Sequence, residues 1–385
     1  MTNPFLFTDE HEEFRLSVRG LAESRFSGTY LEKAKSDKYP SDELRQLGDA
    51  GITGLLVDVG DGGQGADALT LGIAVEEMSH ANLTVGYLVF GSTVACHVVA
   101  QHASPEAKGK WLPGLLAGDS VSALALTEPE SGSDAAAMRT TASRVDRGWI
   151  LNGEKTSVTA VVHADVIIVF AKTDQSAGAR GVTAFLVDAN DPTVTSHPFD
   201  DPGNKPLGRG SVVFDGTFVP DDHMLGALGD GFRIVMHEFD LTRTLIGLIL
   251  TGGAQKALDM TAEYVTQRHA FGQQISRFQG VSFPIAEHTT YVEALRMLSY
   301  RSLGLRVAGR PHSREAAMVK WWGPEVAFNA IKDCIVLHGH VAYSDELPLQ
   351  SMLRDVSAYF IGDGTPQIQK LVIARDVLGR DAVGS

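Results

Sequence analysis

The chain has 385 residues, 44% hydrophobic and 21% charged, which is the composition of a globular protein with a large core. Its 47 acidic residues outnumber its 33 lysines and arginines, and the resulting net charge of −14 disfavours nucleic acid as a partner, because phosphates repel such a surface. The two distant cysteines, Cys96 and Cys334, indicate neither a disulfide framework nor a zinc cluster and suit a reducing cytoplasm.

Residues 1–118 predict an N-terminal helical domain. Acidic residues at 9–12 open a helix at the positive end of its dipole, and apolar stretches at 67–81 and 84–103 predict two further helices. The Gly-rich stretch 60–65 lacks the spacing of a phosphate-binding motif and predicts a surface loop. No basic, apolar leader follows Met1, and no run of about 18 apolar residues occurs, so we expect no secretory signal and no membrane span.

Residues 119–225 change to the pattern of a middle β-domain. Short β-rich runs cover 121–126, 140–145, 149–151, 166–170, 182–187 and 212–219. Turn signals separate them, among them residues 146–148 and Asn152-Gly153. These residues predict a small all-β unit, either a barrel or a sandwich.

Residues 226–385 return to helical spacing. Long helices are predicted at about 230–268, 278–308 and 313–337, with kinks or breaks at Gly252-Gly253, Pro284 and Gly323-Pro324. The fold class is therefore α+β, with a helical domain, a β-domain and a C-terminal helical bundle in that order.

Asp363 lies in a glycine-flanked loop between two apolar helical stretches of the C-terminal part. Flanking glycines allow backbone turns that other residues resist. A carboxylate projected from such a loop into an apolar cleft is suited to take a proton from carbon. The alternative is that Asp363 caps the next helix, because Asp-Gly-Thr-Pro is also a good helix start.

Several motifs share one order and spacing across essentially the whole chain. They lie at residues 124–134, 152–155, 205–210, 268–272, 338–355 and 362–369. Together they closely resemble the signatures of the acyl-CoA dehydrogenase family of flavoenzymes, in which the last motif is the catalytic loop. No single motif is decisive, but the set is specific.

The resemblance implies the same three-domain fold, ending in a four-helix bundle. It also implies FAD held between the β-domain, the bundle and a neighbouring subunit of a homotetramer or homodimer. The implied reaction is the α,β-dehydrogenation of an acyl thioester carried by CoA or by an acyl carrier protein. Asp363 would take the α-proton while the β-hydride passes to flavin N5. An electron-transfer flavoprotein or O2 would then accept the electrons, in the cytoplasm.

Residue roles follow from the resemblance position by position. Thr127 and Thr159 would hydrogen-bond the flavin ring, and Arg268 and Phe271 would meet the FAD of the adjacent subunit. The full set expected to bind the cofactor is Leu126, Thr127, Ser133, Ser157, Thr159, Arg268, Phe271, His340, Thr365 and Gln367.

The set expected to bind the substrate is Ser133, Asp240, Arg243 and Gly364. A guanidinium such as that of Arg243 binds phosphate and carbonyl oxygens well. The alternative for Arg243 is a helix-surface residue paired with Asp240 three positions earlier. One branch of the family has its base just before this arginine. That position is Thr242 here, which leaves Asp363 as the only base of the family type. We expect no metal, since His338 and His340 lack a third ligand.

Some positions depart from the family pattern. Asp363 replaces the usual Glu and retracts the carboxylate by about 1.5 Å, the length of one C–C bond. A branched, cyclic or unusually functionalised acyl group would suit such a change. Ser157 stands where many members have a Trp against the flavin. Val336, His340 and Ala342 replace the usual Gln, Gly and Gly near the neighbour's FAD.

Two other functions remain open at this point. The first keeps the fold and flavin but oxidises a non-thioester carbon acid, because nitroalkane oxidases resemble this chain in using Asp as the base, or reduces an enoyl thioester. The second is a non-catalytic, flavin-poor subunit of a hetero-oligomer. The retained Thr127, Ser133, Thr159, Arg268 and Asp363 argue against that second function, because an inactive subunit has no need of them.

Overall fold

The computed structural model describes residues 7–383, so the segment after Met1 in which no signal was recognised lies outside the described residues. The chain begins with a layer of helices. The Thr8 side chain accepts a hydrogen bond from the His11 N–H and caps the first of them. These helices are α1 (Asp9–Arg25), α2 (Tyr30–Lys33), α3 (Ser41–Asp49), α4 (Ala68–Ala81), α5 (Leu83–His102) and α6 (Pro105–Ala117).

Helix α5 is the most apolar element of this layer. By length and composition it is the one described helix able to cross a membrane, but 78% of its most apolar window is buried inside the protein. A core helix of a water-soluble protein passes the same test. The absence of a membrane span therefore remains a prediction.

One mixed sheet of eight strands forms the middle of the chain. Its order is β6-β7-β3-β2-β4-β5-β8, with β1 paired in parallel to β4. Every residue of β4 is buried, and alternate side chains join a core on each face of the sheet. The strands are β1 (Ser122–Ala125), β2 (Thr141–Val145), β3 (Gly148–Val158), β4 (Val166–Lys172), β5 (Val182–Asp188), β6 (Val194–Pro198), β7 (Gly210–Pro220) and β8 (Met224–Leu225).

The two predicted turns have different outcomes. Residues 146–147 do form the hairpin between β2 and β3, with Arg147 at φ 57°. Asn152 and Gly153 lie inside β3 instead, so the turn predicted there is wrong. The register of β3 against β7 shifts at this point, and Gly153 has a φ of 146°. The Asn-Gly pair therefore marks a β-bulge rather than a chain reversal.

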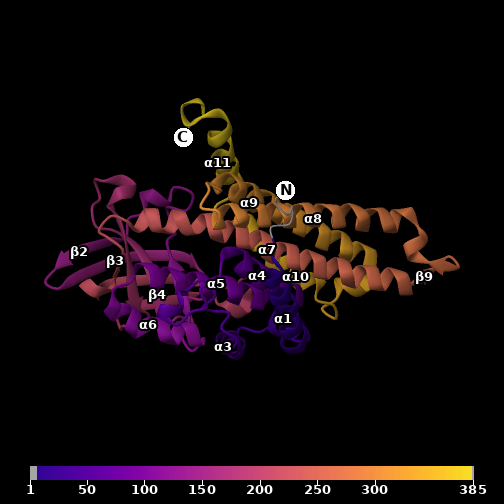
Figure 1. The fold of residues 1–385 in the computed structure, drawn as a ribbon, viewed down its shortest axis with the longest axis horizontal. Helices are drawn as coiled ribbons and strands as arrows, with labels where there is room; N and C mark the ends of the chain where they lie inside the picture. The colour runs from indigo at the N-terminus through magenta and orange to yellow at the C-terminus, as the bar shows by residue number, and fades with distance from the viewer. Residues whose placement is uncertain (1–6, 384–385) are drawn as a thin grey trace.

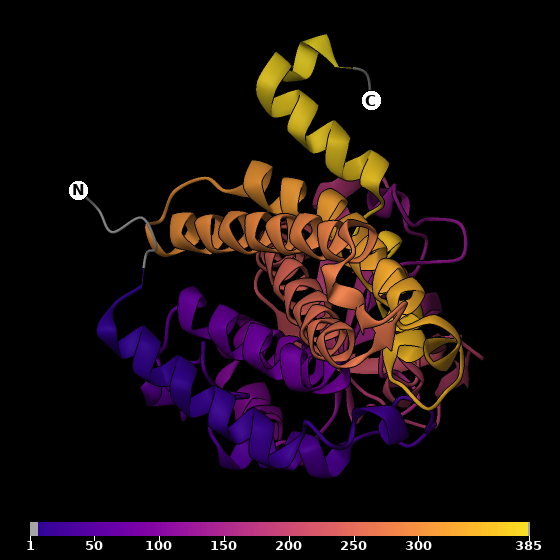
Figure 2. The same ribbon diagram turned by 90° about the vertical axis from the view of Figure 1, so that its right-hand side faces the viewer.

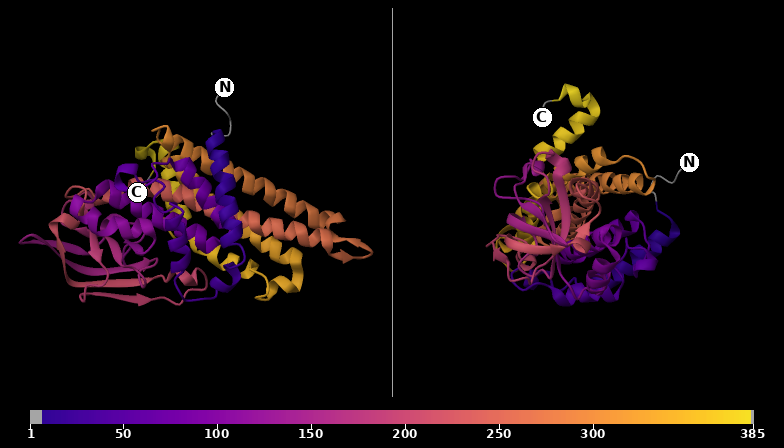
Figure 3. Two further views of the ribbon diagram at one scale, coloured as in Figure 1. Left: turned by 60° about the horizontal axis from the view of Figure 1, so that its bottom comes forward. Right: turned by 90° about the vertical axis from the view of Figure 1, so that its left-hand side faces the viewer.

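The C-terminal part is a bundle of long helices. They are α7 (Gly231–Gln267), α8 (Gln279–Val307), α9 (Ser313–His338), α10 (Leu349–Ser357) and α11 (Pro366–Leu378), and a hairpin of β9 (His269–Ala270) and β10 (Gln273–Gln274) joins α7 to α8. The sheet lies at one end of the molecule and this hairpin at the opposite end, as Figures 1 and 3 show. Short 3₁₀ turns are η1 (Val59–Asp61), η2 (Ala135–Ala137), η3 (Gly178–Gly181), η4 (Lys205–Leu207), η5 (Asp221–His223), η6 (Ile275–Arg277), η7 (Gly339–Tyr343), η8 (Ala358–Phe360) and η9 (Arg380–Ala382).

Glycine and proline do not break these helices. Helix α7 continues through Gly252 and Gly253, and α8 and α9 continue through Pro284 and Pro324. Of the predicted kinks or breaks, the breaks are therefore wrong, whereas the kinks stay a prediction. A Cβ on Gly252 would lie 2.5 Å from the Glu76 carbonyl oxygen of α4. This glycine therefore serves the close packing of two helices.

Helix α11 leaves the body of the protein. Figure 2 shows it projecting away from the bundle, and its apolar residues Val377 and Leu378 are exposed. The loop that carries Asp363 lies at its base, where α11 meets α7 and α9. The domain limits near residues 118 and 225 stay predictions, although the sheet falls between them.

Candidate active site

Asp363 sits in a strained loop between η8 and α11. Its φ is 54° and that of Gly364 is 95°, so both residues adopt the left-handed conformation. Helix α11 begins at Pro366 with Thr365 as its N-cap, so Asp363 does not cap it. The Asp363 carboxylate instead accepts a hydrogen bond from the Thr242 hydroxyl, with 2.8 Å between Oγ1 and Oδ2. The capping alternative is therefore wrong, and the Asp363 side chain instead contacts α7 across the bundle.

Side chains from three helices hold the carbonyl groups of this loop. The Asp363 carbonyl oxygen accepts from Arg243 Nε of α7 at 3.3 Å and from Gln369 Nε2 of α11 at 3.1 Å. Lys320 Nζ of α9 donates to the carbonyl oxygens of Tyr359 at 2.7 Å and Gly364 at 3.3 Å. These bonds hold the backbone in a conformation that non-glycine residues rarely adopt.

Two buried cations flank the Asp363 carboxylate. Burial lowers the pKa of Lys320 to about 8, although the negative charge of Asp363 opposes the shift. Burial also lowers the pKa of Arg243, against the attraction of Asp363 and Asp240. Arg243 Nη1 lies 3.6 Å from Asp240 Oδ1, so the ion pair expected in the alternative interpretation of Arg243 is present. The arginine is buried, however, and does not lie on the helix surface.

The β-domain presents the expected flavin contacts on the loop after β1. Leu126 is buried and Thr127 is half-buried, and the Thr127 carbonyl oxygen accepts from the Thr156 N–H at 2.8 Å. Beneath them the fully buried Lys155 donates to the Leu126 carbonyl oxygen at 2.9 Å and to Glu128 Oε1 at 2.8 Å. The loop is thus fixed by a buried ion pair.

Tyr87 of α5 links the β-domain to the Asp363 loop. Burial raises the pKa of Tyr87 to about 12, and its side chain lies close enough to both Thr159 and Asp363 for each to act on that pKa. A residue expected at the flavin ring and the expected base therefore share a neighbour. Tyr87 is a site residue that the sequence did not reveal.

Ser157 and Ser133 are exposed on the β-domain. Ser157 has a φ of 57°, and its hydroxyl accepts from Arg209 Nη1 at 3.0 Å. Arg209 is itself held by Asp201, with 2.6 Å between Nε and Oδ2. Ser157, the small residue at the position where many members of the resembled family have a Trp, therefore has an arginine beside it.

The remaining predicted residues lie elsewhere. Arg268 directly follows α7, and Phe271 lies in the β9–β10 hairpin at the far end of the bundle (Figure 1), where it is 95% exposed. His340 is exposed in η7. The structure of one chain does not bring these three residues to Asp363. Thr365 and Gln367 stand at the start of α11, next to the loop.

The residues expected to bind FAD have suitable chemistry for it. Thr127 and Thr159 offer half-buried hydroxyl groups of the kind that bind a polar ring edge. The Ser131 hydroxyl, in the loop after Thr127, is buried and has no hydrogen-bond partner within residues 7–383. A polar group bound here would supply the missing partner, which native structures seldom lack.

Three further residues were missed: Thr242 and Lys320 contact the loop from far away in sequence, whereas Gln369 lies only six residues after Asp363. Thr242 was noted only for lacking a carboxylate, and Gln369 was not singled out. Lys320 gave the clearest signal, since it is the one charged residue in the otherwise uncharged stretch from Ala316 to Trp322. A lone lysine in such a stretch indicates a buried cation with a specific partner.

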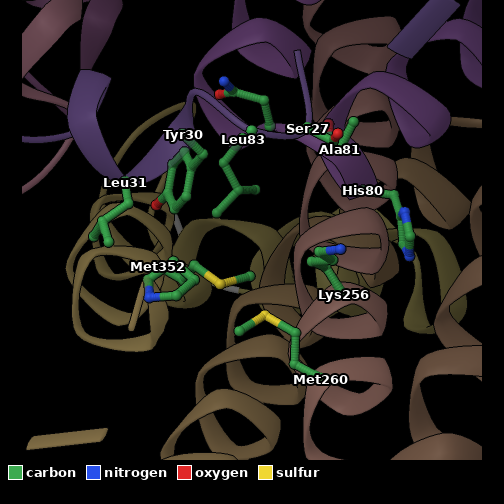
Figure 4. Close-up of a pocket in the computed structure, with 13 residues that line it drawn as sticks. Ser27, Tyr30, Leu31, His80, Ala81, Leu83, Lys256, Met260 and Met352 are labelled. Atoms are coloured by element: carbon green, nitrogen blue, oxygen red, sulfur yellow. The ribbon is translucent and has the colours of Figure 1, made fainter. Parts of the chain in front are cut away.

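A separate cavity of about 300 Å³ lies between the N-terminal helices and α7. Tyr30, Leu83, Lys256, Met260 and Met352 are among the residues that line it, as Figure 4 shows. None of the predicted site residues lines it, so it is no candidate for the reaction. Within residues 7–383 no group of three or more His, Cys, Asp or Glu side chains is placed to hold a metal ion.

Three comparisons bear on this helix–sheet–helix fold. Family models match the acyl-CoA dehydrogenase N-terminal domain over residues 8–119, the middle domain over 123–217 and the C-terminal domain over 229–378. An acyl-CoA dehydrogenase of Bacillus subtilis (strain 168) is 34% identical over 380 residues, which cover 97% of this chain and 99% of that protein.

Two solved structures have closely similar folds. Butyryl-CoA dehydrogenase from Megasphaera elsdenii superposes with a TM-score of 0.91 at 31% identity, covering 97% of this chain and 99% of the other. PigA with FAD and proline superposes with a TM-score of 0.94 at 26% identity, covering 99% and 100%.

The fold and the loop between two helices define a three-domain flavoenzyme. The chain belongs to the acyl-CoA dehydrogenase family. It is a FAD-dependent oxidoreductase, as the resemblance implied.

Proposed function

We propose that the protein oxidises an acyl thioester by α,β-dehydrogenation, with Asp363 as the base that takes the α-proton. The observation that carries the proposal is the way the carboxylate is held. Thr242 binds Oδ2 at 2.8 Å, whereas Oδ1 accepts no hydrogen bond from the residues of the 7–383 range. One oxygen is therefore fixed while the other keeps its lone pairs for a proton.

A thioester α-proton is a weak acid, so the enolate oxygen needs hydrogen bonds as the proton leaves. The backbone N–H groups of Asp363 and Gly364 have no acceptor in the part of the chain that the structure describes. Both lie next to the base, and we propose that they bind the thioester carbonyl oxygen. The arrangement combines a general base with donors for the developing charge.

Residues of this chain would hold FAD from two sides: Leu126, Thr127, Ser133, Ser157 and Thr159 on the β-domain, and Thr365 and Gln367 at the start of α11. Bound FAD would supply the acceptor for the β-hydride. Arg268, Phe271 and His340 are exposed and remote from Asp363, which supports a role at the FAD of a neighbouring copy. A homotetramer or homodimer follows as part of the proposal.

The substrate is proposed to be a CoA or carrier-protein thioester. Arg243 uses Nε for the loop carbonyl and its Nη1 lies 3.6 Å from Asp240, which leaves Nη2 for an oxygen of the substrate. Asp240, beside Arg243, accepts a hydrogen bond from the Ser313 hydroxyl, which fixes the Asp240 carboxylate next to the guanidinium. Because the Asp363 side chain is short, we propose a branched or cyclic acyl group that brings its α-carbon closer. We place the reaction in the cytoplasm, with an electron-transfer flavoprotein or O2 as the final acceptor.

The test is the visible spectrum of the purified protein, followed by anaerobic addition of a panel of acyl-CoAs and acyl carrier proteins. The proposal predicts a yellow protein whose flavin bleaches with one class of thioester. A yellow protein that no thioester bleaches would contradict it and favour a nitroalkane or enoyl substrate. A colourless protein that takes up no FAD would favour the non-catalytic subunit.

A further inference from the structure

Lys320 lies in the first half of α9 and is fully buried, with a relative exposure of 0%. An ammonium group removed from water costs several kcal/mol unless its hydrogen bonds and charge are satisfied. No Asp or Glu side chain within residues 7–383 lies within ion-pair distance of its Nζ. Its partners are instead two carbonyl oxygens, those of Tyr359 and Gly364.

Those two carbonyls bracket the loop that carries the base. Tyr359 lies in η8, before the loop, and Gly364 follows Asp363 directly. One ammonium group therefore ties both ends of the loop to α9. Gln369 Nε2 also donates to the Gly364 carbonyl, at 3.3 Å, but it belongs to α11 at the same end of the loop. Among these donors only Lys320 joins the two ends.

We propose that Lys320 is a positioning residue of the reaction, whose protonated ammonium group clamps the Asp363 loop in its working conformation. The inference rests on the proposed role of Asp363 as the base. In this role Lys320 does not contact the substrate. Its effect passes through the backbone of residues 359–364 and through its charge near the Asp363 carboxylate.

The charge of Lys320 matters as well as its hydrogen bonds. The charged groups that act on it are Asp363 in the loop and Arg243 on α7. Burial places the pKa of Lys320 at about 8. When the amine loses its proton it loses one N–H donor and the attraction to Asp363. The clamp should therefore weaken as the pH rises through about 8.

The experiment compares the holoenzymes of the wild type, Lys320→Met and Lys320→Gln in flavin reduction by the best thioester between about pH 6 and pH 10. We expect kcat to fall about 100-fold in Lys320→Met, as for a misplacement near 1 Å, with little change in KM. Lys320→Gln keeps an N–H donor without a charge, so it should lose the decline of kcat near pH 8 that the wild type shows. FAD content and Tm should stay near those of the wild type, because no buried acidic group loses its partner.

Lys332→Met is the matched control, since Lys332 lies on the same helix with half of its side chain exposed. It should leave kcat and its pH profile unchanged. An unchanged kcat in Lys320→Met, or a decline near pH 8 that survives in Lys320→Gln, would overturn the clamp but leave the thioester reaction standing. A wild type that oxidises no thioester would overturn both.

Discussion

Lys155 and Glu128 form a buried ion pair under the loop that presents Leu126 and Thr127. Lys155 is fully buried and Glu128 is 6% exposed, with 2.8 Å between Nζ and Oε1. Burial lowers the pKa of Lys155 to about 8, despite the attraction of Glu128. Burial alone would raise the pKa of Glu128, but the hydrogen bond and charge of Lys155, together with the bonds from Thr140 and Arg139, outweigh it and the pKa is lowered. The change to test is Lys155→Met.

Lys155→Met leaves the Glu128 carboxylate buried, with only the N–H groups of Arg139 and Thr140 as donors. Removing one partner of a buried pair costs about 3–5 kcal/mol, because the remaining charge is uncompensated. The two retained N–H bonds place the expected loss of unfolding free energy at the low end, about 3 kcal/mol. Equilibrium unfolding in urea at neutral pH measures it.

The double variant Lys155→Met/Glu128→Gln should recover most of that loss, since no buried charge remains. Lys108 and Asp61 provide the surface control, a pair of similar length at 3.0 Å whose side chains are 27% and 36% exposed. Lys108→Met should cost no more than about 1 kcal/mol. A Lys155→Met loss as small as this, or a double variant no better than the single one, would refute the reasoning.

Gly364→Ala should cut kcat at least tenfold, because the φ of Gly364 is 95° and the new Cβ would lie 2.5 Å from Gln369 Nε2. Gly362→Ala is the control, since its new Cβ would lie 3.7 Å from the nearest atom, the Ala358 carbonyl oxygen. Thr242→Val should lower kcat about tenfold in steady-state assays, and Thr242→Ser should restore it. Burial raises the pKa of Asp355 to about 6 from 3.8, so the folded state holds this proton more tightly and stability is lost as the pH rises through about 6. In urea unfolding, the free energy of unfolding of the wild type should fall by up to about 3 kcal/mol over this pH range, and Asp355→Asn should abolish that fall.

The long helices could be predicted from the sequence because periodicity is local. The stretches predicted at 230–268 and 278–308 correspond to α7 and α8 within one residue at each end. Breaks were predicted wrongly at Gly252 and Pro284, because the local cost of glycine or proline was weighed without the packing that offsets it. Gly252 is needed where α4 approaches α7.

Strand β6 was missed for a related reason. Its residues, Val194–Pro198, show little alternation of apolar and polar side chains and are mostly exposed, so no apolar pattern indicates a strand there. Pairing with β7 defines the strand, and that partner lies beyond a loop. Asn152-Gly153 carries a strong turn signal that the continuous pairing of β3 with β7 overrides.

The site was predictable only in part. The motif at 362–369 identified Asp363, and the structure places it in a left-handed loop bonded to Thr242. The groups that hold the loop could not be deduced, because Lys320 and Thr242 lie 43 and 121 residues away in sequence from Asp363. Which distant side chains meet at a loop depends on helix packing, and one sequence does not show it.

The most direct test of the account is the rate of flavin reduction in the Asp363→Asn holoenzyme, measured anaerobically by stopped flow with the thioester that bleaches the wild type. If Asp363 takes the α-proton, this rate should fall about 1,000-fold or more, while FAD content and thioester binding remain. An α-deuterated thioester should also slow the wild type. A fall of less than about tenfold in Asp363→Asn would show that another group takes the proton and would contradict the assignment.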